Sequence, residues 1–136
     1  VNMTRFSITL KEGVNFVLES LERMWGGELF IPKIPSYKLT DLAKAIAPQC
    51  KINIIGIRPG EKIHEEMITS SDSHNTYDLG EYYVILPSTI SGKWTIDEFI
   101  KKFNAKPVPK NFSYNSGTNS DWETVESLRL LISENL

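Results

Sequence analysis

An apolar run that stops at a charged turn constrains the fold of this chain more than any other feature. Residues 52–57 are mostly isoleucine, and Arg58-Pro59-Gly60-Glu61 follows directly. Short β-branched runs bounded by turn residues are typical of buried strands, and proline ends them because it lacks a backbone donor. A strand here is therefore expected to bring one fixed cation and one fixed anion to the same rim.

The residue types at this rim favour a phosphorylated sugar ligand. The guanidinium of Arg58 can donate two parallel hydrogen bonds to phosphate oxygens and keeps its charge at any physiological pH. The carboxylate of Glu61 only accepts hydrogen bonds, which suits ribose hydroxyls. Together they predict a pocket for a nucleoside diphosphate that carries a sugar. The alternative is a structural turn whose Arg58 and Glu61 pair in solvent, and this segment alone does not separate the two.

Size and composition limit the possible classes of protein. The chain has 136 residues, 40% of them hydrophobic, which predicts one domain with one modest core. A net charge of −2 argues against a nucleic-acid partner, and no apolar stretch approaches the roughly 20 residues that span a bilayer. The single Cys50 predicts a reduced, partly buried thiol and a cytoplasmic location. Because the chain opens abruptly at Val1, we expect it to be the C-terminal portion of a longer protein.

Hydrophobic periodicity predicts alternating helices and strands. Thr9 and Glu12 form a capping box, and Gly26-Gly27 marks the end of the helix that it opens. The face that this helix is expected to bury comprises Val14, Val17, Leu18, Leu21 and Met24. Further strands are predicted at residues 29–31, 52–57 and 81–86, with helices at 39–47 and 63–68 and a closing helix after a second capping box, Ser120 and Glu123.

Proline spacing predicts where the chain divides. The Pro107-Val108-Pro109 spacer separates a lobe at residues 1–106 from a C-terminal extension at residues 107–136, which carries the closing helix.

The sequence lacks the motifs of several chemistries. It contains no Gly-x-Gly-x-x-Gly dinucleotide fingerprint and no P-loop, and none of its tyrosines is followed by a lysine four residues on. His64 and His74, with Glu65 and Glu66, do not have the His-Glu-x-x-His spacing of a zinc site. We therefore expect no catalytic residue, cofactor site or metal site within these residues.

Four stretches taken together carry a family resemblance. The chain resembles the C-terminal substrate-binding part of extended short-chain dehydrogenase/reductases that act on nucleotide sugars. Among these it looks most like the inverting UDP-N-acetylglucosamine 4,6-dehydratases of bacterial pseudaminic acid and capsule pathways. The stretches are Met3-Thr4-Arg5-Phe6-Ser7-Ile8-Thr9-Leu10, Phe30-Ile31-Pro32-Lys33-Ile34-Pro35, Leu39-Thr40-Asp41-Leu42-Ala43 and Arg58-Pro59-Gly60-Glu61-Lys62-Ile63-His64-Glu65.

The resemblance implies a fold and a role. It implies an α/β substrate-binding lobe whose Rossmann core is largely missing, in which Arg5 and Arg58 grip the diphosphate and Glu61 meets the ribose. In such enzymes NADP oxidises C4 of the sugar, water leaves across C5 and C6, and hydride returns to C6 with inversion at C5. The missing domain would hold the NADP, so this chain alone is expected to be inactive, and the intact enzyme is expected to be a homo-oligomer.

Two other interpretations remain open. One is the equivalent lobe of a nucleotide-sugar epimerase, which shares Arg58 and Glu61. The other is a non-catalytic assembly module that uses Trp94 and Trp122 as aromatic anchors. An isolated substrate-binding lobe would expose the apolar face that normally meets the nucleotide domain, which predicts poor solubility or self-association.

Overall fold

The computed structural model describes residues 2–89 and 94–135 as a mixed α/β protein. Contacts divide the chain into two units, each assembled from separate segments. The first unit comprises Val1–Thr9, Ile34–Glu66 and Tyr114–Leu136, and the second comprises Leu10–Lys33 and Met67–Ser113. The lobe boundary predicted after residue 106 stays a prediction.

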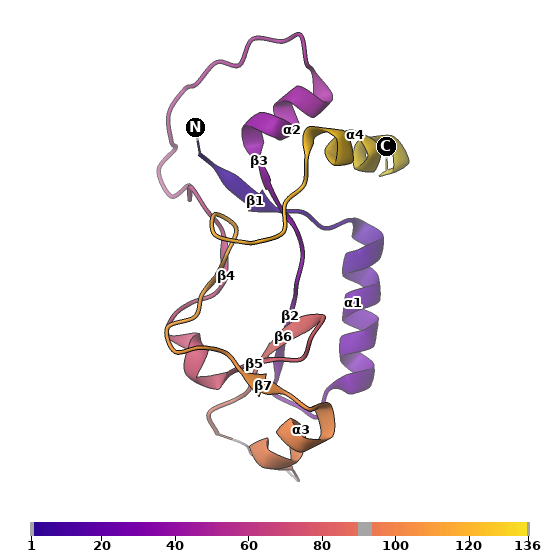
Figure 1. Cartoon of the computed structure of the whole chain (residues 1–136), viewed down its shortest axis with the longest axis vertical. Coiled ribbons are helices and arrows are strands. Elements are labelled where there is room, and N and C mark those ends of the chain that lie inside the picture. Colours follow the sequence, from indigo (N-terminus) through magenta and orange to yellow (C-terminus); the bar gives the residue numbers. More distant parts are fainter. Residues whose placement is uncertain (1, 90–93, 136) are drawn as a thin grey trace. The chain divides into compact units, whose positions relative to one another are not determined.

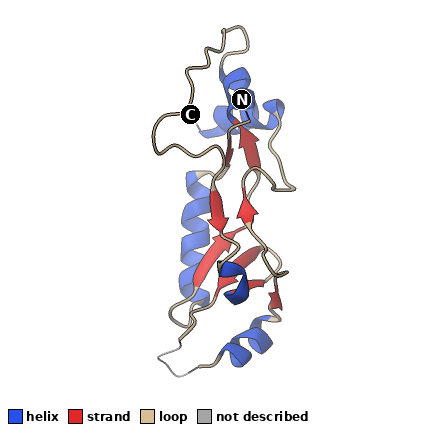
Figure 2. Ribbon diagram, turned by 90° about the vertical axis from the view of Figure 1, so that its left-hand side faces the viewer, coloured by secondary structure: helices blue, strands red, loops and turns tan. Residues whose placement is uncertain are grey.

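An antiparallel four-stranded sheet forms the centre of the second unit. Its strand order is β2-β6-β5-β7, with Ile31 opposite Tyr83 and Tyr77 opposite Val84. The predicted strands at residues 29–31 and 81–86 are thereby confirmed. The long helix α1 runs beside this sheet, as Figures 1 and 2 show. The bounds are α1 Leu10–Arg23, β2 Leu29–Pro32, β5 Thr76–Asp78, β6 Tyr82–Ile85 and β7 Lys106–Pro107, with a short 3-10 helix, η1, at Asp72–Asn75.

An aromatic cluster forms the core of the second unit. Val84, Leu86 and Phe99 are at most 1% exposed, and the ring of Trp94 lies 5.7 Å from that of Phe99. Phe99 belongs to α3 (Ile96–Phe103), a helix that the periodicity did not predict. Trp94 is thus used for packing within the unit, which weakens its proposed role as an anchor for another protein.

Helix α1 forms as predicted, but its apolar face is not buried. The helix ends at Arg23, and Gly26 and Gly27 follow with φ values of 119° and 95°. The predicted inward residues are 46–59% exposed, and α1 contributes no buried residue. The burial prediction is wrong for this chain because, within the residues described, no second layer covers this face. The residues concerned are Val14, Val17, Leu18, Leu21 and Met24.

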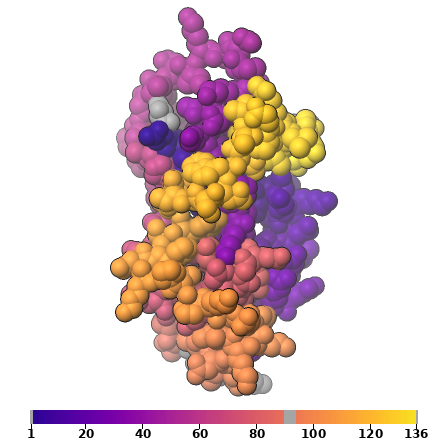
Figure 3. Space-filling model, in the orientation of Figure 1, coloured from indigo at the N-terminus to yellow at the C-terminus, as the bar shows by residue number. Residues whose placement is uncertain are grey.

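The first unit combines a strand pair with two packed helices. Strand β1 (Thr4–Phe6) pairs antiparallel with β3 (Ser36–Lys38), so that Arg5 lies opposite Tyr37. The predicted helix at residues 39–47 is confirmed as α2, Leu39–Ile46. Figure 3 shows the C-terminal residues of α4 (Val125–Asn135), in yellow, lying against α2. The remaining strands are β4 at Glu66–Ile68 and β8 at Tyr114–Asn115.

The closing helix begins later than predicted, and a different pair of residues caps it. The Ser127 amide donates to Thr124 Oγ1 at 3.1 Å, and the Thr124 amide donates to Ser127 Oγ at 2.8 Å. The predicted cap from Ser120 is wrong because the chain before Thr124 is held against β3. There the Glu123 amide donates to the Ser36 carbonyl at 2.8 Å, which keeps this stretch out of the helix.

Two predictions between α2 and β4 are also wrong. Residues 51–58 form no strand and are exposed, and Figure 1 shows them within a long loop that follows α2. A strand needs a neighbour to pair its amides, and the described part of the chain places none beside this run. The predicted helix at residues 63–68 is replaced by β4. There the Glu65 carbonyl accepts from the Ser116 amide at 2.8 Å, so it is not available to a helix.

Candidate functional site

Strand β1 places Arg5 beside residues 63–65. The Thr4 amide donates to the Ile63 carbonyl at 2.9 Å, and this bond brings the two segments together. Arg5 Nη1 donates to the carbonyls of Thr4 at 2.7 Å and Ile63 at 3.3 Å, while its Nε lies 3.4 Å from Glu65 Oε1. The guanidinium is therefore held in place on one side by protein groups.

The predicted charged turn forms at residues 58–61. The Glu61 amide donates to the Arg58 carbonyl at 3.1 Å, and the Arg58 amide donates to Glu61 Oε2 at 3.1 Å. Gly60 has a φ of 82°, which a side chain would disfavour. Within residues 2–89 and 94–135, the Arg58 guanidinium makes no hydrogen bond or ion pair. The anticipated side-chain pair of Arg58 with Glu61 is thus not formed, and the cation remains available.

Arg58 and Glu61 line one pocket of about 370 Å³ in the first unit. This volume lies within the range of small-molecule sites, which combine apolar walls with a few polar groups. Arg5 is not one of the described residues that line this pocket. The apolar wall comes from the N-terminal segment, α2 and the loop, through Met3, Leu39, Ala43, Ile52, Ile54 and Ile55.

The chemistry of this pocket is that of binding. Arg58 offers charge-assisted donors to an anion, and Glu61 offers acceptor oxygens beside them.

The described residues contain no group of three or more His, Cys, Asp or Glu side chains arranged to hold a metal ion. Cys50 is exposed, which corrects the expectation that it would be partly buried. No helix in the described ranges has the length and apolarity needed to cross a membrane.

A buried polar network next to Arg5 was missed at the sequence level. Thr4 Oγ1 lies 2.8 Å from His64 Nδ1 and 2.7 Å from Ser116 Oγ, and Thr4 and Ser116 are 3% and 0% exposed. The partners are 60 and 112 positions apart in the chain, so no local pattern could have connected them.

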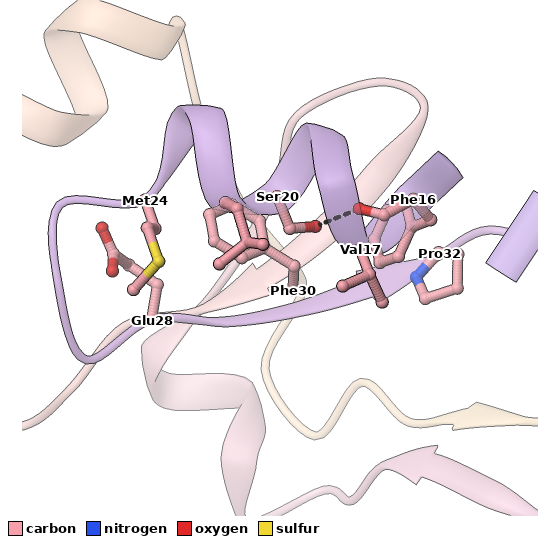
Figure 4. A pocket seen from close by; sticks show the side chains of 8 residues that line it. Phe16, Val17, Ser20, Met24, Glu28, Phe30 and Pro32 are labelled. Carbon is pink, nitrogen blue, oxygen red and sulfur yellow. Dashed lines mark hydrogen bonds between the residues drawn. The ribbon is translucent and has the colours of Figure 1, made fainter. Parts of the chain in front are cut away.

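A second pocket, of about 380 Å³, lies between α1 and β2 in the second unit. Figure 4 shows Val17 on the helix and Phe30 on the strand among its lining residues. Its polar groups are occupied: Ser20 Oγ donates to the Phe16 carbonyl at 2.6 Å. The Glu28 carboxylate accepts from two backbone amides of the turn after α1 at 2.7 Å. This pocket is therefore an apolar surface without the groups that would orient a polar ligand.

Comparison with known proteins identifies relatives. The sequence model of a family described as polysaccharide biosynthesis protein matches residues 1–87. An inverting UDP-N-acetylglucosamine 4,6-dehydratase of Campylobacter jejuni is 51% identical over 132 residues, which are 96% of this chain and 40% of that protein. A UDP-glucose 4-epimerase of Rickettsia canadensis is 40% identical over 88 residues, covering 62% of this chain and 26% of the relative.

A solved structure shares the fold. The X-ray structure of Pen from Bacillus thuringiensis superposes with a TM-score of 0.75 at 31% identity, over 98% of this chain and 39% of that one. The chain thus spans about two fifths of the length of the dehydratase and of this structure.

Proposed function

Since the chain belongs to the polysaccharide biosynthesis protein family, we propose that it forms the nucleotide-sugar-binding part of an inverting UDP-N-acetylglucosamine 4,6-dehydratase. The observation that carries the proposal is the 51% identity to such an enzyme across 96% of this chain. The pocket that Arg58 and Glu61 share supports it, because a guanidinium beside a carboxylate suits a diphosphate beside ribose hydroxyls.

In this proposal each site residue has one task. Arg58 binds the diphosphate through its unpaired guanidinium, and Glu61 accepts hydrogen bonds from the ribose hydroxyls. Arg5 adds a second positive charge toward the diphosphate from the neighbouring strand. Because Arg5 lies outside the pocket lining, its contribution is a long-range electrostatic one.

We propose that the cofactor is held by polypeptide outside these residues. The dehydratase chemistry requires NADP as hydride acceptor, and these 136 residues contain no glycine-rich dinucleotide loop that fits it. We propose that a Rossmann domain provides this site and that the present chain, an α/β lobe with residues 107–136 as its extension, is cytoplasmic, works in a homo-oligomer and is inactive alone. The lobe would contribute binding and orientation, which are worth on the order of 7–11 kcal/mol in well-aligned reactions.

The exposed isoleucines support a missing neighbour for the first unit. Ile52, Ile54, Ile55 and Ile57 are 49–76% exposed, an unusual state for a run of this composition. In a Rossmann-type enzyme such a run would be covered by the nucleotide-binding domain.

An epimerase lobe is the second candidate. It is favoured by the 40% identity to UDP-glucose 4-epimerase over 88 residues. The longer and closer match to the dehydratase ranks that enzyme first. Both candidates predict a UDP-sugar at the same pocket, and turnover assays after joining this lobe to a Rossmann domain would distinguish elimination from epimerisation.

A binding titration tests the proposal directly. UDP and UDP-N-acetylglucosamine would be added to the ¹⁵N-labelled chain while amide resonances are followed. We expect shifts centred on residues 58–61 and 39–43, and at least about tenfold weaker binding for Arg58→Ala, because a charge-assisted contact is lost. Lys51→Ala, which removes an exposed cation from the same loop, is the matched control. Shifts confined to other regions, or equal affinity of the two variants, would contradict the proposal.

A further inference from the structure

Three distant segments meet at the buried hydroxyl of Thr4. Its Oγ1 lies 2.8 Å from His64 Nδ1 and 2.7 Å from Ser116 Oγ. Ser116 is joined to the chain after the charged turn by two further bonds, because its Oγ accepts from the Glu65 amide at 2.9 Å and its amide donates to the Glu65 carbonyl at 2.8 Å. These contacts, here called the Thr4 clamp, tie residues 64–65 to β1 and to the residue after β8.

The Glu65 amide fixes the role of the Ser116 hydroxyl in the clamp. The Glu65 amide can only donate, so Ser116 Oγ accepts there and its own proton is free to go to Thr4 Oγ1. The Thr4 hydroxyl can donate to His64 Nδ1 when that nitrogen carries no proton, and it accepts from Nδ1 in the other tautomer. Both arrangements keep His64 and Ser116 joined through Thr4 Oγ1.

Gly117 shows how tightly the imidazole is enclosed. A Cβ at this position would lie 2.6 Å from His64 Nδ1 and 2.7 Å from Cγ. Such distances are far below van der Waals contact, so any side chain here must displace the ring. The glycine is needed for this close approach, which makes the ring position sensitive to residue 117.

The clamp lies directly after the proposed ligand-binding turn. Only two residues separate Glu61 from His64, whereas residues 47–62 on the other side form no helix or strand. Glu65, inside the clamp, also holds Arg5 Nε at 3.4 Å. The same set of contacts therefore holds both the turn that carries Arg58 and the strand that carries Arg5.

We propose that Thr4, His64 and Ser116 are positioning residues that hold the Arg58–Glu61 turn and Arg5 in the geometry that binds a nucleoside diphosphate. The inference rests on the proposed function, but it assigns roles to residues outside the ligand contacts. It also gives the C-terminal extension a task at the site, because Ser116 and Gly117 belong to it.

Isosteric variants test the hydroxyl. Thr4→Val keeps the shape of the side chain and removes both of its hydrogen bonds, and we expect about fivefold weaker UDP binding. Thr4→Ser restores the hydroxyl and should restore most of the affinity. Thr118→Val makes the same chemical change at an exposed neighbour and should bind like wild type. Circular dichroism confirms that each variant is folded.

A double-mutant cycle tests the imidazole. Gly117→Ala should weaken UDP binding in the wild-type background by expelling the ring, and should have little added effect in a His64→Ala background, where no ring is present. Additive effects of the two changes would overturn the clamp.

The outcomes separate the two hypotheses. If wild type binds UDP and Thr4→Val binds equally well, the clamp has no positioning role although the proposed function stands. If wild type does not bind UDP, the proposed function fails and the clamp loses its task with it.

Discussion

Asp78 shows how a single residue connects stability to pH. Its Oδ1 lies 2.7 Å from Lys33 Nζ, and it also accepts from the Gly80 amide at 2.7 Å. Partial burial raises the pKa of the Asp78 carboxyl, but the Lys33 and Gly80 hydrogen bonds outweigh it and leave the pKa below its ordinary value. Lys33 thereby contacts both Asp78 and the ring of Tyr83, whose centroid is 4.4 Å from Lys33 Nζ.

The lowered pKa predicts acid sensitivity. A carboxylate with a depressed folded-state pKa adds stability above its unfolded pKa of about 3.9 and loses it as the pH falls through the folded value. We expect Asp78→Asn to lose up to about 1 kcal/mol at pH 7 and to show a flatter stability profile below pH 4. Urea unfolding at several pH values measures this, with exposed Glu134→Gln as control. An unchanged slope in Asp78→Asn would exclude this ion pair as a source of the pH dependence.

At the scale of elements, a capping box starts a helix only where the residues that follow it are free to become helical. Helix α3 begins at a reciprocal pair: the Glu98 amide donates to Thr95 Oγ1 at 3.2 Å, and the Thr95 amide donates to Glu98 Oε2 at 2.7 Å. This Thr-x-x-Glu signal is visible in the sequence, yet α3 was not predicted. The Ser120 signal, with the same form, does not start a helix because β3 holds the following residues.

The α3 cap predicts a measurable loss of stability. Thr95→Ala should destabilise the second unit by about 1 kcal/mol, because the Glu98 amide at the start of α3 loses its acceptor, Thr95 Oγ1. The effect should reach the core, since α3 carries the fully buried Phe99. Thermal unfolding followed by circular dichroism measures the change. Ser70→Ala, an exposed hydroxyl deletion, is the control, and equal melting temperatures would show that the cap contributes nothing.

At the scale of the whole molecule, the main feature is the exposure of large apolar side chains. Large hydrophobic side chains on α1 and in residues 52–57 are mostly half or more exposed. Soluble monomers rarely expose contiguous apolar patches of this kind. This agrees with a chain that spans about two fifths of its relatives, whose remaining residues are candidates to cover these surfaces.

Self-association of the chain is the resulting prediction. We expect concentration-dependent oligomers in sedimentation velocity, and a shift toward monomer for Leu18→Glu with Leu21→Glu. These side chains are 56% and 59% exposed, so stability should fall little. Leu130→Glu, at a 58% exposed position on α4, tests whether any added charge has the same effect. A wild-type chain that remains monomeric at high concentration would refute the prediction.

Local sequence determined much of this protein. The strands at residues 29–31 and 81–86, helices α1 and α2, and the Arg58–Glu61 turn all follow from periodicity, capping and turn chemistry, which depend on neighbouring residues. The sequence also predicted that Arg58 and Glu61 lie close together, and both line one pocket, although the strand expected to carry them does not form.

Tertiary structure alone decided the rest. The run at residues 52–57 needs a pairing neighbour to become a strand, and the apolar face of α1 needs a second layer to be buried. Neither requirement can be judged from local pattern. The Thr4 clamp depends on residues 60 and 112 positions apart, which only the folded chain brings within hydrogen-bond distance. A short-range pattern specifies what an element can bury or bond, but the partner that satisfies it is fixed by long-range packing.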